Sequence, residues 1–195
     1  MHGYPAPTYS VTSEPATEPL TLDELKNRLR ILSCDFDTEL TDLMKAGRKT
    51  VEDDTYRKLI TQTVAMYLED FPGTYGDIEI RLAPVSAITH VKYYDQDDTL
   101  TTYSSDNYYT NLTSTPPRLV LKESQSWPNT QVYRPNKVVV TMTAGYGAAS
   151  AVPQVAKLAI AEWVRATWSG CDGRTESYKR LVSSLQWTAY HRVCS

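Results

Sequence analysis

The fold is decided between Asn136 and Trp163, where the sequence reads Asn-Lys-Val-Val-Val-Thr-Met-Thr-Ala-Gly-Tyr-Gly-Ala-Ala-Ser-Ala-Val-Pro-Gln-Val-Ala-Lys-Leu-Ala-Ile-Ala-Glu-Trp. The run of β-branched residues near its start predicts a strand, because such side chains pack well on a pleated surface. Gly145 and Gly147 end this strand, since glycine adopts a positive φ without steric cost. Pro153 then opens a helix, whose first turn does not need the missing N–H. A β-rich region therefore gives way to a helix, and no reactive side chain lies at the joint.

Two helices are predicted before the β-rich region. Thr21 is the expected N-cap of the first, and Glu24 completes a Thr-x-x-Glu capping box. The second begins near Asp37, with acidic residues in its first turn as the helix dipole favours. Gly47 lies on the apolar face of this second helix and would allow another backbone to come close.

The hydrophobic period changes from 3.6 to 2 between about Leu59 and Ala144. Residues 78–82 alternate apolar and charged side chains, as expected of a strand with one wet face. The segment 95–98 is a predicted hairpin turn between two further strands. Because the strands are gathered between helices, the sequence predicts an α+β fold: an inserted antiparallel β region in a helical core made of the first two helices and the C-terminal helices.

The helix after Pro153 carries a wide apolar stripe, which predicts burial in the core or between subunits. A last helix, capped near Thr175, is amphipathic. The predicted organisation has five parts: a flexible arm at 1–16, an N-terminal helical part at 17–58, a β-rich region at 59–147, a core helix at 148–173 and a C-terminal arm at 174–195.

The amino-acid composition limits the classes of protein to which the chain can belong. The 195 residues are 22% charged and 41% hydrophobic, with a formal net charge of −3, which is typical of globular proteins. No apolar run reaches the roughly 18 residues that a transmembrane helix needs, so we expect no membrane span. The N-terminus lacks the pattern of a secretory signal. Cys34, Cys171 and Cys194 form no CxxC pair, which favours a reduced cytoplasm as the place of synthesis.

Aromatic usage is uneven, with 14 Tyr against 2 Phe and 4 Trp. Tyr and Trp combine a large contact area with a polar tip, and both are enriched at protein interfaces. This bias predicts surfaces that are wet before assembly and covered after it. Half-exposed positions on strands are the alternative interpretation.

The sequence patterns that could indicate catalysis or metal binding are each incomplete. The histidines lie far apart in sequence, at His2, His90 and His191. Cys171, His191 and Cys194 lack the paired spacing of structural zinc sites. The acidic segment 95–98 has Leu100 where a calcium loop needs glycine, so a solvated turn is the better interpretation. We therefore predict no enzyme, no catalytic residue, no metal and no cofactor.

The chain nevertheless resembles a known family, the head–tail connector (adaptor) proteins of long-tailed bacteriophages and gene transfer agents. The resemblance covers about residues 17–168 and includes the strand, Ala-Gly-Tyr-Gly, Val-Pro and apolar helix quoted above. The other matching segments keep their order and spacing: Glu18–Arg30, Asp37–Arg48, Leu59–Thr63, Asp70–Gly73, Leu82–Ile88, Ser104–Tyr108 and Gln125–Pro128.

This resemblance implies a structural protein of the virion neck, made in the host cytoplasm. It implies a dodecameric homo-oligomeric ring, which contacts the portal protein on one side and tail-completion or stopper proteins on the other. DNA would pass through the central channel without sequence-specific binding, and the acidic charge balance suits such passage. No membrane partner is expected.

We assign two sets of residues to these contacts. The C-terminal arm would dock on the portal through its amphipathic helix and the residues after it: Tyr178, Arg180, Leu181, Leu185, Trp187, Tyr190 and Arg192. The wide stripe of the preceding helix would meet a neighbouring subunit through Leu158, Trp163 and Trp168. The alternative for the last helix is that it folds back on its own subunit.

Two other functions stay open at this stage. A small hydrolase could carry an unrecognised catalytic site on the β region. A binding module could capture a small ligand on the same surface. Turnover by a monomer would favour the first, whereas a ring that depends on the portal would favour the connector.

Overall fold

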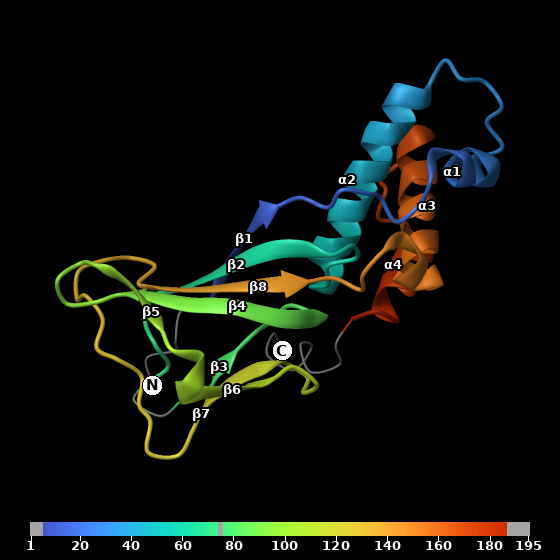
Figure 1. The fold of residues 1–195 in the computed structure, drawn as a ribbon. Coiled ribbons are helices and arrows are strands. Elements are labelled where there is room, and N and C mark those ends of the chain that lie inside the picture. The colour runs from blue at the N-terminus through green and yellow to red at the C-terminus, as the bar shows by residue number, and fades with distance from the viewer. Residues whose placement is uncertain (1–5, 74–75, 187–195) are drawn as a thin grey trace. The chain divides into compact units, whose positions relative to one another are not determined.

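The computed structural model describes residues 6–73 and 76–186, and it confirms the α+β class. The chain divides into two compact units: a β unit, residues 1–14 and 62–145, and a helical unit, residues 15–61 and 146–195 (Figure 1). The described helices are α1 (Leu22–Leu29), α2 (Asp37–Thr55), α3 (Gln154–Trp168) and α4 (Glu176–Ser183). The described strands are β1 (Thr8–Ser13), β2 (Gln62–Leu68), β3 (Ile78–Glu79), β4 (Val85–Tyr94), β5 (Leu100–Tyr103), β6 (Tyr108–Asn111), β7 (Arg118–Leu121) and β8 (Val138–Ala144).

The β unit contains two antiparallel sheets. The larger has the order β1-β2-β8-β4-β5 and the smaller β3-β7-β6. Strand β8, predicted from its β-branched residues, lies at the centre of the larger sheet and pairs with β2 and β4 along its length. Val138, Val140 and Met142 are fully buried, while the residues between them are half-buried. This alternation explains why the strand is fixed in register, since a slip of one residue would expose its whole apolar face.

The two sheets share one hydrophobic cluster. Aromatic rings fill part of it: Phe71 stacks on Trp127 with ring centroids 4.9 Å apart, and Tyr103 stacks on Tyr108 at 6.1 Å. Pairs of this kind add stabilisation beyond the area that they bury. The predicted hairpin at 95–98 is confirmed by the Asp95 N–H, which donates to the Thr99 carbonyl oxygen at 3.0 Å.

The predicted flexible arm at 1–16 needs a correction, because residues 8–13 form strand β1. This strand pairs antiparallel with β2, in register from Thr8 to Val11 and with a shift of register before Ser13. The Arg81 N–H donates to the Tyr9 hydroxyl oxygen at 2.8 Å, which fixes the strand further. Residues 8–13 form a strand because the backbone N–H and C=O groups along the edge of β2 need hydrogen-bond partners.

The helical unit begins as predicted. The Thr21 side chain accepts from the Glu24 N–H at 3.2 Å, and the Glu24 carboxylate accepts from the Thr21 N–H at 2.9 Å, so the capping box is present. The α2 and α3 helices pack side by side (Figure 1). A Cβ atom on Gly47 would lie 3.1 Å from the ring of Trp163, which confirms that Gly47 permits a close approach.

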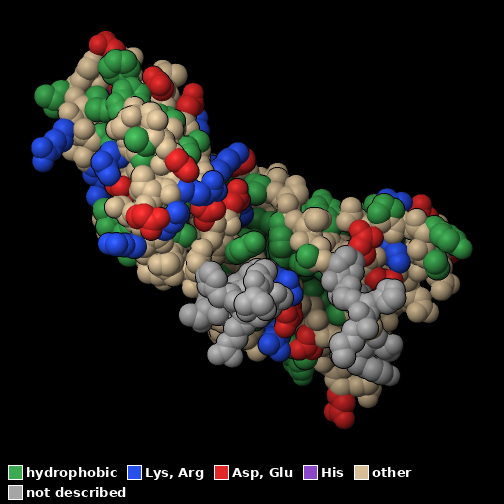
Figure 2. Space-filling model, turned by 180° about the vertical axis from the view of Figure 1, so that it is seen from behind, with side chains coloured by type: hydrophobic (Ala, Val, Ile, Leu, Met, Phe, Trp, Pro, Cys, Tyr) green, Lys and Arg blue, Asp and Glu red, His purple; other side chains and the backbone are tan. Residues whose placement is uncertain are grey.

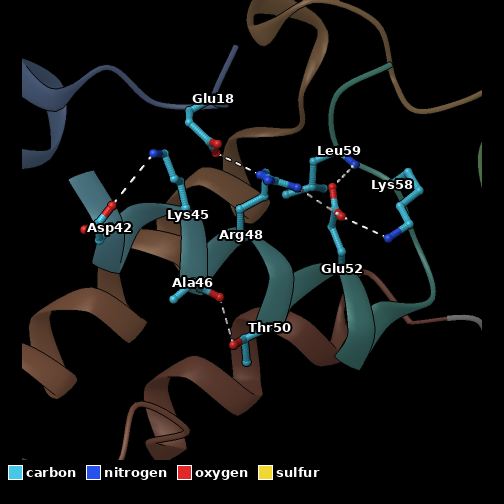
Figure 3. A network of polar contacts seen from close by, with 9 residues as sticks. All are labelled: Glu18, Asp42, Lys45, Ala46, Arg48, Thr50, Glu52, Lys58 and Leu59. Carbon is cyan, nitrogen blue, oxygen red and sulfur yellow. Dashed lines mark hydrogen bonds and ion pairs between the residues drawn. The ribbon is translucent and has the colours of Figure 1, made fainter. Parts of the chain in front are cut away.

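A buried ionic cluster lies at the C-terminal half of α2 (Figure 3). Glu52 accepts from Arg48 Nη1 at 3.4 Å, from Lys58 Nζ at 3.1 Å and from the Leu59 N–H at 2.9 Å. The Arg48 Nε donates to the Glu18 carboxylate at 2.8 Å. Arg48 and Glu52 are 3% and 2% exposed, so both charges depend on these partners rather than on water.

This cluster lies beside the segments by which the chain passes between the units. Glu18 follows the first passage, and Leu59 precedes the second. The chain passes back into the helical unit at Tyr146, and there it is bonded to the segment that leaves this unit. The Tyr146 N–H donates to the Leu59 carbonyl oxygen at 3.2 Å, and the Thr61 N–H donates to the Gly147 carbonyl oxygen at 3.1 Å. These bonds explain why the β unit extends over 62–145 whereas the predicted β-rich region was 59–147.

We predict that Arg48→Ala lowers the free energy of unfolding of the helical unit by about 3 to 5 kcal/mol, because Glu18 loses the cation that it contacts and the buried Glu52 keeps only Lys58. Urea titration followed by far-ultraviolet circular dichroism measures the change. Lys45→Ala is the matched control on the same helix: its ion pair with Asp42 is solvent-exposed and worth about 1 kcal/mol or less. Equal effects of the two substitutions would contradict the assigned role of the cluster.

Candidate functional site

Of the α3 residues predicted to form a subunit interface, Leu158 is exposed, at 38%. Trp163 is half-buried between α2 and the segment after α3, where a Cβ atom on Gly173 would lie 2.4 Å from its ring nitrogen. Trp168 is half-buried and meets Phe36 edge-on, with ring centroids 5.2 Å apart. Both tryptophans therefore pack largely within their own unit, and Leu158 keeps the exposure that a subunit contact requires.

An apolar patch that sequence reasoning missed lies on the loop between α1 and α2. Leu32 is 96% exposed and Phe36 43% exposed. Figure 2 shows hydrophobic side chains at this end of the helical unit. The signal was available in the sequence, since Ile31, Leu32 and Phe36 interrupt an otherwise polar connection. Large side chains held in water at a loop are typical of surfaces that another protein covers.

The C-terminal docking surface needs a correction at Tyr178. Its side chain is 1% exposed and belongs to the core of the helical unit, so α4 packs on its own unit and Tyr178 is not an accessible anchor. Leu181 and Leu185 are half-buried against the same core, and Arg180 is exposed. The remaining predicted docking residues lie outside the described residues: Trp187, Tyr190 and Arg192.

Asp54 at the end of α2 holds α4 in this position. Both of its carboxylate oxygens accept from Arg174 at 2.9 Å, and one also accepts from the Tyr178 hydroxyl at 2.8 Å. Burial alone would raise the pKa of Asp54, but the hydrogen bonds from Arg174 and Tyr178 outweigh it and lower the pKa. Burial, together with the bond to Asp54, raises the pKa of Tyr178, so its phenol stays neutral. A bidentate contact of this geometry fixes orientation as well as position.

The chain beyond α4 is tied to the end of α2 and to the residue Arg57 just after it by two further contacts. The Arg57 Nε donates to the Leu185 carbonyl oxygen at 2.6 Å, and the Gln186 side chain donates to the Asp54 carbonyl oxygen at 3.0 Å. These bonds hold the last described residues, Leu185 and Gln186, on the helical unit.

The β unit carries a second candidate surface on the loop of residues 122–137, between β7 and β8. Trp127 is 5% exposed, and its ring N–H donates to the Gly76 carbonyl oxygen at 2.7 Å. Thr130 donates to the Asp70 carboxylate at 2.8 Å. The first half of this loop is therefore fixed to the body of the β unit.

The second half of the same loop is fixed as well. The Arg134 guanidinium lies 3.4 Å from the centroid of the Tyr94 ring, and it donates to Asp98 at 2.8 Å. Lys137 forms an ion pair with Asp70 at 2.9 Å. Burial would raise the pKa of Asp70, but the hydrogen bonds from Lys137 and Thr130 lower it.

Between these anchors, Val132 is 70% exposed and Tyr133 is 95% exposed. Beside them lies a hollow of about 530 Å³ lined by Asp70, Phe71, Gly73, Gln96, Trp127, Pro128, Asn129, Thr130 and Val132. Hydrophobic side chains are visible at this end of the β unit in Figure 2. The sequence did not predict the exposed loop residues or the hollow, because the residues that fix the loop come from segments distant in the chain. The high tyrosine content was the one general indication of such a surface.

Chemically reactive groupings are not brought together in the part of the chain that the structure describes. His90 is half-buried on β4, and burial and Lys92 lower its pKa. Asp95 accepts from the N–H groups of Asp97 and Thr99, so it serves the turn. Residues 6–73 and 76–186 contain no group of three or more His, Cys, Asp or Glu placed to hold a metal ion. None of the described helices is long and apolar enough to cross a membrane.

The sequence matches no protein-family model and no curated protein. Solved structures that contain a chain with the same fold include three from gene transfer agent particles. The chain from the neck of an empty gene transfer agent particle, computed with C6 symmetry, has a TM-score of 0.76 and 18% identity and covers 92% of this chain and 95% of its own length. The chain from a native gene transfer agent virion has a TM-score of 0.73 and 16% identity, covering 92% and 95%.

The third, from the neck of a native gene transfer agent particle computed with C12 symmetry, has a TM-score of 0.72 and 18% identity, covering 92% of this chain and 94% of its own. The protein thus has a fold found in the necks of gene transfer agent particles, over both of its units. The resemblance predicted from the sequence is confirmed at the level of the fold.

We predict that Tyr178→Ala destabilises the helical unit by about 3 to 5 kcal/mol, because it opens a cavity in the core and removes a hydrogen bond to Asp54. Arg180→Ala, two residues away on the exposed side of α4, should change stability by no more than about 0.5 kcal/mol. Thermal and urea unfolding of the two variants give the comparison. If Tyr178→Ala unfolds like the unsubstituted protein, α4 is detached from the helical unit and our correction is wrong.

Proposed function

We propose that this chain is a structural protein of a virus-like particle, a head–tail connector in the neck where the head joins the tail. The observation that carries the proposal is the extent of the shared fold, 92% of this chain and 95% of a neck chain. A module that had only one domain in common with such proteins would not match over both units. Fold alone is a weak guide to function, so the proposal depends on the surfaces as well.

The proposed working form is a ring of twelve copies. Two of the similar structures are necks computed with C6 and C12 symmetry, which supports a closed ring. A ring of identical subunits needs heterologous contacts, in which two different surfaces of the same chain meet. The helical unit offers exposed apolar side chains for such contacts at Leu32, Phe36 and Leu158.

The ring would lie between a portal protein and a tail-completion or stopper protein. For the portal we propose the outer side of α4, with Arg180 exposed and Leu181 and Leu185 half-buried, continued by the chain beyond Gln186. DNA would pass through the channel without sequence-specific binding. A formal net charge of −3 supports this, because strong binding to phosphates requires a clustered excess of Lys and Arg.

The hydrolase and ligand-binding alternatives would have to use the β unit. The hollow beside Asp70 is the candidate place, but this carboxylate is already engaged by Lys137 and Thr130 in a structural role. The similar structures are two necks and a virion of gene transfer agent particles, and they lend no support to a catalytic function. We therefore prefer the structural proposal.

Removing the gene from a particle-producing strain tests the proposal. We expect DNA-filled heads and separate tails, as seen by electron microscopy, and restoration of joined particles when the chain is supplied in trans. Leu32→Asp should restore few joined particles, because Leu32 is 96% exposed and its substitution affects contacts rather than folding. Thr38→Asp, which adds the same charge at an exposed polar position on α2, is the control. Normal particles without the gene would refute the proposal.

A further inference from the structure

The larger sheet of the β unit ends at β1, and none of the described strands pairs with its outer side (Figure 1). The side chains of Thr8, Ser10 and Thr12 are exposed along this strand. An edge strand presents a row of backbone N–H and C=O groups to which a further strand can bond. The outer edge of β1 is therefore a place where another strand can extend the sheet.

β1 lacks most of the features by which proteins protect such an edge. Edge strands are commonly very short, bulged, charged or interrupted by proline. β1 has six residues, Thr-Tyr-Ser-Val-Thr-Ser, with no charged residue and no proline among them. Its shift of register lies at the end of the strand, between Val11 and Ser13. An edge of this length and composition is open to pairing with another chain.

The other edges of the two described sheets are better protected. β5 and β6 have four residues each, and β3 has two. β4 is longer, but β5 pairs with residues 91–94 of it. Two shifts of register interrupt the remainder of β4, between Val85 and Ala87 and between Ile88 and His90. Bulges bend and twist a strand and so hinder the pairing of an incoming chain. This contrast within one protein sets the edge of β1 apart.

A second copy of this chain is a poor occupant of the edge. Two β1 strands that paired antiparallel would form an isologous contact, which closes into a dimer and cannot continue around the proposed ring. The other described edges are shorter than β1, or bulged in the case of β4, and so match it poorly. The edge therefore fits an extended segment of a different protein.

The side chains of β1 define the chemistry of that segment. Tyr9 and Val11 are half-buried, and Tyr9 packs on the core of the β unit. The side chains that alternate with them are hydroxyl-bearing and exposed, at Thr8, Ser10 and Thr12. A strand added beside β1 continues both faces of the sheet, because successive side chains point to opposite faces. It needs apolar residues next to Tyr9 and Val11, and small polar residues next to the hydroxyl groups.

We propose that the outer edge of β1 binds an extended segment of another protein of the particle neck, in which apolar residues alternate with Ser or Thr and charged residues are absent. Main-chain hydrogen bonds give such an added strand its affinity, and the alternate side chains give it specificity. The inference rests on the proposed function in the neck. It names the surface, and the kind of segment, by which this chain joins a different protein.

Photo-crosslinking in assembled particles tests the contact directly. The photoreactive amino acid p-benzoylphenylalanine replaces Thr8, Ser10 or Thr12 in turn, each of which has an exposed side chain. After irradiation of purified particles, we expect a covalent adduct between this chain and a second protein of the particle. Peptide mass spectrometry should map the adduct to an uncharged segment in which apolar residues alternate with Ser or Thr. The same amino acid at Thr110, exposed on β6, is the control and should give little of this adduct.

A lysine on the edge provides a second measurement. Ser10→Lys places a charge where the added strand would lie, so we expect about tenfold fewer joined particles, with an unchanged melting temperature of the purified chain. Thr110→Lys adds the same charge at the edge of the smaller sheet and should leave the number of joined particles unchanged.

Four results would overturn the inference: no adduct from any position on β1, adducts between copies of this chain alone, an adduct in a charged segment of the second protein, or equal effects of the two lysine variants. The connector proposal is judged separately, by whether joined particles form without the gene. The failure of one proposal can therefore be told from the failure of the other.

Discussion

The buried carboxylate of Glu52 is the constraint on which the helical unit depends. Its desolvation costs several kcal/mol, and the cost is offset because Arg48, Lys58 and the Leu59 N–H all donate to it. The Leu59 N–H can reach it because Tyr56 ends α2 in a left-handed conformation, with φ of 54°. The chain that leaves α2 is thus fixed before it enters the β unit. The returning chain is fixed in turn by the bond between the Tyr146 N–H and Leu59.

Other carboxylates that accept several hydrogen bonds determine which surfaces are available for assembly. Polar contacts hold α4 and the long β7–β8 loop in place, by Asp54 in the helical unit and by Asp70 in the β unit. Each carboxylate has a lowered pKa because its hydrogen bonds outweigh its burial. The β7–β8 loop, fixed in this way, presents its exposed residues Val132 and Tyr133 in defined positions. Rigid, exposed apolar groups suit a structural protein whose task is to join other proteins.

Features encoded by neighbouring residues could be predicted, and those that depend on distant segments could not. The capping box at Thr21, the glycines after β8 and the close approach at Gly47 are local signals, and the structure has all of them. The strand β1 was missed because its partner β2 lies more than fifty residues away. Tyr178 was placed on the wrong surface because an amphipathic stripe does not reveal what covers it.

Cryo-electron microscopy of particles produced in the presence of this chain is the most direct test of the central claim, that copies of the chain form a ring in the neck. The account predicts a closed ring of copies between head and tail, with density that accommodates the four described helices and the two sheets in every subunit. A neck that is complete without such density, or copies of the chain on the capsid surface or the tail fibres, would contradict it.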